Sequence, residues 1–338
     1  MNAATTPGRP GAADTAPDAL RTVAAVVTAF RAGENLVELV ETLAPVLGAV
    51  VVVDDGSGTG SDAVLARAQA AGATVVRHPQ NRGIAAALNT GIAAARAAGG
   101  SAPVGTTPPA PAAPAPAPAF VLTLDQDSRI DAALIQRLVA TARDAASAGL
   151  PVGLVAPARI EGLPSAAVSS EKGFLIGGTP IQSGMLIPVD TVDAVGPFAE
   201  ALFIDGVDTD FALRVTASGR RVLLAMGTEL GHSLGERHTP RLLGRPVALG
   251  GAPVALVVSK PFRYYYLVRN RILLNRRYGR SHRAWTVQQT LADLRHCVIV
   301  QLLLPGRRAR GRAMLAGLRA GWAGRAGRIP SPVEAQLR

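Results

Sequence analysis

The segment "GAVVVVDDGS" (residues 48–57) places five apolar residues directly before two aspartates. A short valine-rich run without polar interruption is typical of a strand that is buried on both faces of a parallel sheet. Upstream, "RTVAAVVTAF" (21–30) has the same character, and "ENLVELVETLAPVL" (34–47) has the apolar spacing of an amphipathic helix. The order strand, helix, strand predicts two neighbouring parallel strands joined by a helix.

The same alternation continues along the chain. We expect a helix at "SDAVLARAQAAG" (61–72), a strand at "ATVVRHP" (73–79), a helix at "GIAAALNTGIAAARAAG" (83–99) and a buried strand in "FVLTLDQDS" (120–128). Strands that alternate with helices at this pitch form a mostly parallel sheet with helices on both faces. The sequence therefore predicts an α/β fold.

Composition indicates how the 338 residues are divided. Residues 1–20 lack periodicity, and we expect a disordered leader there. An α/β domain over residues 21–255 is expected to carry a Pro/Ala-rich surface insertion at 99–119, since that stretch cannot build a core. Residues 256–338 are predicted to form a basic, helical C-terminal extension.

The net charge of +11 is concentrated in that extension, because residues 260–338 hold 17 Lys and Arg against 2 Asp and Glu. The segment "KPFRYYYLVRNRILLNRRYGR" (260–280) interleaves arginine with aromatic and aliphatic residues, which favours contact with anionic lipid head groups. Solvated arginines and binding to nucleic acid are the alternatives. The arginines expected to meet the lipid are Arg269, Arg271, Arg276 and Arg277.

Cysteine content and hydropathy bear on location. The single cysteine, Cys297, excludes an internal disulfide, and we find no apolar run of the length that a membrane-spanning helix needs. A cytoplasmic protein, peripheral on the inner face of the cell membrane, is the expectation.

Aspartates follow two of the predicted strands, where open α/β sheets bind their ligands. If strand geometry persists, Asp125 and Asp127 point the same way, and a divalent cation such as Mg²⁺ or Mn²⁺ would relieve their repulsion. A turn with solvated acids is the alternative.

The other acid pair, Asp54 and Asp55, precedes "GSGTG" (56–60). A dinucleotide-binding fingerprint fits poorly, because its glycines follow the first strand and its acid comes about twenty residues later. An acid at this strand end can instead accept a hydrogen bond from the imide N–H of uracil or thymine. A helix N-cap by Ser57 or Ser61 is the structural alternative.

Four of these segments occur in an order that resembles the nucleotide-sugar half of glycosyltransferase family 2, the inverting enzymes with the GT-A fold. They are "VVTAF" (26–30), "VVVVDDGSGTGS" (50–61), "NRGIAAALNTGI" (81–92) and "LTLDQDS" (122–128). Downstream, "GPF" (196–198), "FIDGVDTDFALR" (203–214) and "GHSLGE" (231–236) resemble the acceptor half of bacterial rhamnosyltransferases.

The resemblance implies a role for each matching residue. Asp208 would be the catalytic base, and Asp205 and Asp210 would bind the acceptor, although Asp210 also suits a helix start. Asp125, Asp127 and His232 would hold Mg²⁺ or Mn²⁺. The donor would be bound by Thr28, Phe30, Asp54 or Asp55, Arg82, Gly83, Asp125 and Gln126.

The implied reaction is transfer of a sugar with inversion, from dTDP-L-rhamnose to a lipid-linked or polysaccharide acceptor of the cell wall. Galactofuranose or another hexose from a UDP donor is the alternative within the family. A catalytically inactive, membrane-associated binding protein and an NAD-dependent oxidoreductase are alternatives from other classes.

Overall fold

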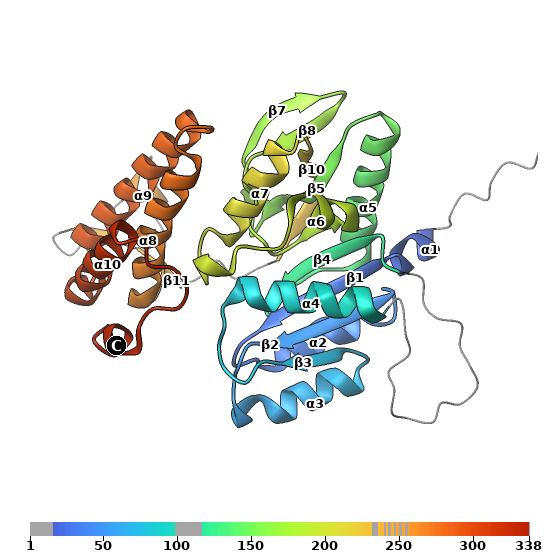
Figure 1. The fold of residues 1–338 in the computed structure, drawn as a ribbon, viewed down its shortest axis with the longest axis horizontal. Helices are drawn as coiled ribbons and strands as arrows, with labels where there is room; N and C mark the ends of the chain where they lie inside the picture. Colours follow the sequence, from blue (N-terminus) through green and yellow to red (C-terminus); the bar gives the residue numbers. More distant parts are fainter. Residues whose placement is uncertain are drawn as a thin grey trace, which may run out of the picture.

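The computed structural model describes residues 16–98, 117–231, 236–239, 241–242, 245–246, 248–249, 252–253 and 256–337. A ten-stranded sheet with the strand order β3-β2-β1-β4-β9-β5-β10-β8-β7 forms its centre, and β6 pairs with β5 (Figure 1). The strands are β1 (Val23–Ala29), β2 (Ala49–Asp54), β3 (Thr74–Arg77), β4 (Phe120–Asp125), β5 (Val152–Ile160), β6 (Leu163–Pro164), β7 (Ala167–Glu171), β8 (Phe174–Gly177), β9 (Met185–Pro188) and β10 (Arg221–Leu230).

Most strands of this sheet run in one direction. The strands β3, β2, β1 and β4 are parallel to one another, and β10 is parallel to β5. Among the described strands, β9 runs antiparallel to both of its neighbours, and β8 and β6 also run against the majority. The predicted α/β class with a mostly parallel sheet is confirmed.

Helices cover both faces of the sheet, and the alternating side chains of β1 explain why. Val23, Ala25 and Val27 pack into one core cluster, while Ala24 and Val26 pack into the cluster on the other face. The first face is covered by α1 (Ala16–Arg21), α2 (Glu34–Leu43), α3 (Asp62–Ala70) and α5 (Ala132–Ser147). The second is covered by α4 (Ile84–Ala98), α6 (Val189–Val195), α7 (Val207–Ala217) and part of α8 (Pro261–Tyr278).

The chain is ordered earlier than the sequence predicted. Helix α1 begins at Ala16, the Leu20 side chain is buried in the first core, and the Arg21 guanidinium donates to the carbonyls of Leu47 (2.9 Å) and Pro45 (2.7 Å). The expectation of a disordered leader is therefore wrong for residues 16–20, because a buried leucine and an arginine anchor them. Residues 1–15 lie outside the described residues, as do residues 99–116 of the expected insertion.

The C-terminal extension is helical, as predicted. Helices α8, α9 (Arg283–Leu303) and α10 (Arg307–Trp322) form a bundle beside the sheet, followed by α11 (Ser331–Ala335) (Figure 1). Short antiparallel pairs precede the bundle: β11 (Glu236–His238) with β16 (Leu256–Val258), β12 (Arg241–Leu242) with β13 (Arg245–Pro246), and β14 (Ala248–Leu249) with β15 (Ala252–Pro253).

The arginines of α8 correct one expectation. Helix α8 lies between the sheet domain and the other helices of the bundle, and each of the four arginines contacts protein groups. Arg269 is fully buried, Arg271 pairs with Asp293 of α9, Arg276 donates to the Trp322 carbonyl of α10, and Arg277 pairs with Asp210 of α7. Arg269 and Arg271 are therefore unavailable to a lipid surface, whereas Arg276 and Arg277 are exposed and the prediction of lipid contact stays open for them.

Candidate functional site

A cavity of about 1010 Å³ lies at the carboxyl ends of β1 and β4, between the sheet and the helical bundle. The α/β domain and the C-terminal extension both supply its wall. From the first come Thr28, Ala29, Phe30, Arg31, Asp55, Asn81, Gly83, Ile84, Ala87, Asp125, Gln126, Asp127, Phe203 and Ile204. From the second come Lys260, Pro261, Phe262, Arg263, Tyr266, Ala309, Arg328, Ile329, Glu334 and Leu337.

The end of β4 forms a tight turn at this cavity. The strand stops at Asp125, whose carbonyl accepts from the Ser128 N–H (3.1 Å), and the Ser128 hydroxyl accepts from the Asp125 N–H (3.1 Å). The assumption that strand geometry continues to Asp127 is therefore wrong, because Gln126 and Asp127 belong to the turn. The turn nevertheless brings both acids to the wall of one cavity.

Neighbouring strands fix the Asp125 carboxylate. The Thr28 hydroxyl at the end of β1 donates to Asp125 Oδ1 at 3.1 Å, and Gln182 Nε2 donates to the same oxygen. Gln126 joins the same strand ends, since its side chain accepts from the Phe30 N–H (2.8 Å) and donates to the Phe30 carbonyl (3.3 Å). Gln182 escaped the sequence analysis because it lies 57 residues from Asp125 in the chain.

The two acids that end β2 differ in position. Asp55 lines the cavity and accepts from the backbone N–H groups of Arg82 (2.8 Å) and Gly83 (2.8 Å). Asp54 is buried, contacts the Ser57 hydroxyl and N–H, and pairs with Arg77 at 3.4 Å. Asp55 is thus the one of the pair that faces the cavity, and Asp54 shapes the loop.

The helix-cap alternative for the serines of this loop is not realised. Ser61 precedes α3 but makes no side-chain capping bond. The Ser57 hydroxyl instead contacts the Asp54 carboxylate and accepts from the Arg31 N–H at 2.7 Å. Ser57 therefore joins the loop after β2 to the end of β1.

A buried histidine that the sequence analysis missed supports Asp55. His78 Nδ1 lies 2.7 Å from Asp55 Oδ1, and His78 Nε2 lies 3.0 Å from the Thr90 hydroxyl of α4. His78 follows β3, next to β2 in the sheet, so the strand order brings it to Asp55. A histidine near the end of the predicted strand 73–79 was the available signal.

The loop before α7 carries backbone strain. Phe203 and Asp205 have φ values of 64° and 61°, a left-handed conformation that is costly for residues other than glycine. The Asn270 side chain of α8 holds this loop by donating to the carbonyls of Leu202 (3.0 Å), Ile204 (2.7 Å) and Asp205 (2.6 Å).

The same loop contacts the cavity wall at Gly83. The Phe203 carbonyl accepts from the Ile84 N–H at 2.9 Å. A Cβ atom at Gly83 would lie 2.6 Å from both the Phe203 carbonyl oxygen and the Phe203 ring. Position 83 therefore has room for glycine alone, which gives the predicted donor-site glycine a steric reason.

Asp208 lies in the first turn of α7, and its Oδ1 accepts from the Thr209 N–H at 2.7 Å. Burial raises the pKa of the Asp208 carboxyl to about 6. The negative charges of Asp205 and Asp125 add to this effect, and the Thr209 N–H opposes it. Asp208 is thus close enough to Asp125 to interact electrostatically.

Asp205 binds the helical extension. It pairs with Arg263 of α8, whose Nε lies 3.3 Å from Asp205 Oδ2, and Arg263 itself lines the cavity. Sequence analysis did not select Arg263, because its partner lies 58 residues upstream.

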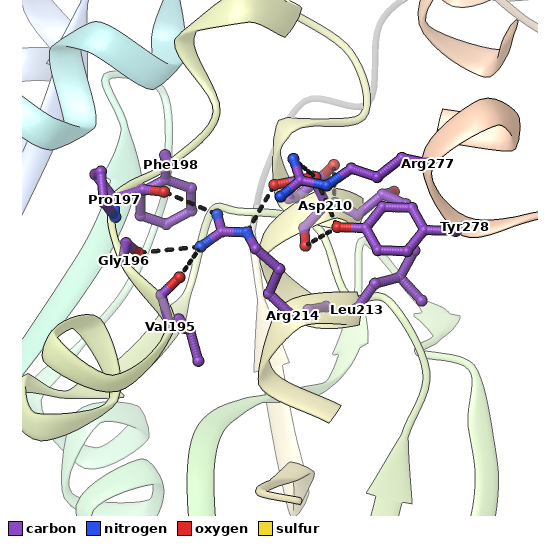
Figure 2. A network of polar contacts seen from close by, with 12 residues as sticks. Val195, Gly196, Pro197, Phe198, Asp210, Leu213, Arg214, Arg277 and Tyr278 are labelled. Carbon is purple, nitrogen blue, oxygen red and sulfur yellow. Dashed lines mark hydrogen bonds and ion pairs between the residues drawn. The ribbon is translucent and has the colours of Figure 1, made fainter. Parts of the chain in front are cut away.

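Asp210 has a structural role, so the expectation that it binds an acceptor is wrong. Its carboxylate is only 1% exposed and accepts from Arg214 Nε (2.9 Å), Arg277 Nη1 (2.9 Å) and the Tyr278 hydroxyl (2.8 Å), as Figure 2 shows. Arg214 also donates to the carbonyls of Val195, Gly196 and Pro197. Through Arg214, this network connects the backbone of "GPF" (196–198) to Asp210 within "FIDGVDTDFALR" (203–214).

Five predicted residues are absent from the cavity wall that the described residues form: Asp54, Arg82, Asp205, Asp208 and Asp210. The guanidinium of Arg82 reaches Glu200 at 3.4 Å, although the Arg82 backbone binds Asp55. His232 lies outside the described residues. Within the part of the chain that the structure describes, no group of three or more His, Cys, Asp and Glu side chains is arranged to hold a metal, and no helix is long and apolar enough to cross a membrane.

Comparison with known proteins gives a family match for part of the chain. Residues 24–152 match the model of glycosyl transferase family 2. Over 97 residues the chain is 31% identical to the dTDP-rhamnosyl transferase RfbF of Shigella flexneri, a match that spans 29% of each chain.

Solved structures also resemble the fold. One is S. aureus TarS 1–349 in complex with UDP-GlcNAc, with 11% identity, a TM-score of 0.46 and coverage of 93% of this chain and 78% of that one. Another is glucosyl-3-phosphoglycerate synthase from Mycobacterium tuberculosis with Mg²⁺ and UDP, with 19% identity, a TM-score of 0.41 and coverage of 66% and 75%. The segment that matches the model of glycosyl transferase family 2, residues 24–152, carries Thr28, Asp55, Gly83, Asp125 and Asp127.

Proposed function

We propose that the chain transfers a sugar, with inversion, from a nucleotide-sugar donor to an acceptor hydroxyl. The observation that carries this proposal is the convergence of Asp55, Asp125 and Asp127 on one cavity at the carboxyl edge of the sheet, inside the family 2 segment. Asp208, with its raised pKa, interacts electrostatically with Asp125. Asp208 does not line the cavity, so its proposed place in the reaction rests on the charge interaction with Asp125 that helps to raise its pKa.

The donor side suits a pyrimidine nucleotide. Asp55 uses carboxylate oxygens to hold the Arg82 and Gly83 N–H groups and still lines the cavity, where it can accept from an imide N–H. Phe30 lines the same wall and is 40% exposed, so its ring is available to a base. The similarity to the Shigella flexneri protein favours dTDP-L-rhamnose. UDP-galactofuranose or another UDP-hexose is the alternative.

Asp125 and Asp127 fit a divalent cation. Carboxylate oxygens are preferred by Mg²⁺ and Mn²⁺, which commonly complete their shells with substrate phosphates. Such an ion would offset the charge of the diphosphate leaving group. Thr28 and Gln182 position the Asp125 carboxylate for this role. His232 is the proposed third protein ligand.

Asp208 is the proposed general base. Inverting transfer needs a carboxylate to take the proton of the acceptor hydroxyl as that oxygen attacks the anomeric carbon. A carboxyl with a pKa of about 6 is mostly ionised at neutral pH and is a stronger base than an ordinary aspartate. Asp205 would bind acceptor hydroxyls beside it. The acceptor is a lipid-linked intermediate or polysaccharide, and an anionic membrane surface is the proposed partner that presents it.

A donor panel tests this function. Release of dTDP or UDP from dTDP-L-rhamnose, UDP-galactofuranose and other UDP-hexoses should be followed by NMR, with Mg²⁺, with Mn²⁺ and with excess EDTA. We expect release from the rhamnose donor that depends on the metal and is lost in Asp127→Ala. No release from any donor would refute glycosyl transfer. Undiminished release in EDTA would refute the metal role of Asp125 and Asp127.

A further inference from the structure

Helix α9 exposes one apolar face. Five side chains, which we call the α9 stripe, are each between 47% and 61% exposed. They lie three or four residues apart, so they share one side of the helix over about 22 Å. The α9 stripe consists of Val287, Leu291, Leu294, Val298 and Leu302.

Packing leaves the α9 stripe facing outward. The opposite side of α9 binds α8: Thr290 accepts from Asn275 (2.8 Å), Asp293 pairs with Arg271 (2.6 Å) and the His296 ring stacks on Tyr264. The polar side of this helix is therefore used inside the bundle, and the apolar side is left uncovered. An uncovered row of five large apolar side chains indicates an interaction surface.

Exposed arginines surround the α9 stripe. Arg283 begins the helix, Arg295 follows Leu294, and Arg307 donates to the Leu302 carbonyl at the far end. The single acid of α9, Asp293, is turned toward Arg271. Residues 294–333 contain eight arginines and no acid. The surface thus combines apolar side chains with positive charge.

We propose that the α9 stripe lies on an anionic membrane, with its leucines at the level of the acyl chains and its arginines at the head groups. A second copy of this chain would bring three arginines of one stripe against those of the other without compensating acids, which opposes self-association. The inference rests on the proposed function, because a membrane-bound chain would meet a lipid-linked acceptor. Ala309 and Arg328 of the same C-terminal extension line the cavity, where they would contact such an acceptor.

Vesicle binding tests the proposal. The full chain should co-sediment with phosphatidylcholine vesicles that contain phosphatidylglycerol, less with phosphatidylcholine alone, and less as salt is raised. The double variant Leu291→Gln/Leu294→Gln should lower the partition coefficient by roughly tenfold or more. Val168→Gln, at an exposed apolar side chain of β7, is the matched control and should bind like the native chain. Equal binding of the double variant and the native chain would overturn the proposal.

Two further measurements separate the alternatives. Light scattering without lipid should give a monomer, and a dimer that the double variant dissociates would assign the α9 stripe to a second copy. Nucleotide release without vesicles should be equal in the double variant and the native chain, because the α9 stripe lies outside the cavity wall. A chain that binds anionic vesicles but releases nucleotide from no donor would refute the proposed function while supporting this inference.

Discussion

At the scale of single residues, two aspartates in the first turn of α7 have opposite surroundings. Asp208 and Asp210 are two positions apart, so their side chains point to opposite sides of the helix. Asp210 points inward to three donors, whereas the Asp208 carboxylate accepts from the N–H of Thr209 and has a raised pKa. Their surroundings indicate a structural role for Asp210 and leave Asp208 as the proposed base.

The rate of transfer should depend on pH through Asp208. Because its pKa is about 6 in the folded chain, the carboxyl is protonated below pH 6 and kcat/KM should fall there. Asp208→Asn should lower transfer about 10²- to 10⁴-fold at pH 7.5 and abolish this acid limb, while the donor still binds. Rate profiles and donor titration check both. A variant with native turnover would move the base to Asp205.

The raised pKa of Asp208 also predicts that the free energy of unfolding depends on pH. Stability should fall as pH rises, whereas the transfer rate should rise. A carboxyl whose pKa is raised on folding stabilises the folded chain below its unfolded pKa of 3.8, and this stabilisation is lost as pH rises through about 6. Asp208→Asn should therefore be more stable than the native chain at pH 8, by on the order of 1–3 kcal/mol, but not at pH 4. Urea unfolding at the two pH values measures the difference.

Asp210→Asn should destabilise the fold. The change leaves Arg214 and Arg277 without their buried counter-charge, a loss of about 3–5 kcal/mol in the free energy of unfolding. Asp190→Asn is the control, since that aspartate is 68% exposed and pairs with Arg220 at the surface, where a pair contributes about 0–1 kcal/mol. Denaturant unfolding compares the two. Unchanged stability with weaker acceptor binding would restore Asp210 to the acceptor site.

At the scale of secondary-structure elements, small residues let α10 approach α8. A Cβ atom at Gly317 would lie 2.4 Å from the Tyr265 carbonyl oxygen, whereas at Gly311 the nearest atom would be the flexible Gln301 amide at 3.2 Å. The two glycines belong to one helix, so helix propensity treats them alike. Packing alone distinguishes them.

Gly317→Ala should therefore destabilise the chain by about 1–3 kcal/mol, because a methyl group forces α10 away from α8. Gly311→Ala should be neutral or should stabilise by up to about 1 kcal/mol, as alanine favours helix. Thermal unfolding of both variants measures the contrast. Equal effects would indicate that α8 and α10 do not pack closely in solution.

Elements also show what the sequence could and could not predict. The valine-rich runs of β1, β2 and β4 predicted the parallel half of the sheet and the edge where Asp55 and Asp125 meet. The supporting residues were not predictable, because His78 and Gln182 reach their partners only through the strand order. The burial of Arg269 was not predictable, since composition does not tell which face of a basic helix lies against other layers.

At the scale of the whole molecule, residues 99–116 are attached at the edge of the sheet opposite to the cavity. They follow the end of α4 and precede β4, whose amino end begins at Phe120, whereas the cavity lies at its carboxyl end. Next to the attachment point, the Ala119 N–H donates to the Thr22 carbonyl at 2.9 Å. The sheet separates the attachment point from the site.

Replacing residues 99–116 by a short Gly/Ser loop should therefore leave transfer and donor affinity unchanged. The Ala119–Thr22 bond anchors β4 without the removed residues. Nucleotide release and donor titration compare the shortened and native chains. A marked loss of donor affinity in a folded, shortened chain would show that the segment contributes to the site.

The Asp210 network also has a consequence for the order in which the protein is made. Three side chains donate hydrogen bonds to this buried carboxylate. Two of them, Arg277 and Tyr278, are synthesised 67 and 68 residues after it. A ribosome-bound chain can complete the parallel sheet from β1 to β4 early, since domains form in the order of synthesis. Helix α7 cannot bury its acid until α8 has emerged. The first turn of α7, which carries Asp208, and the part of the cavity wall that α8 supplies are therefore both completed only after the parallel strands.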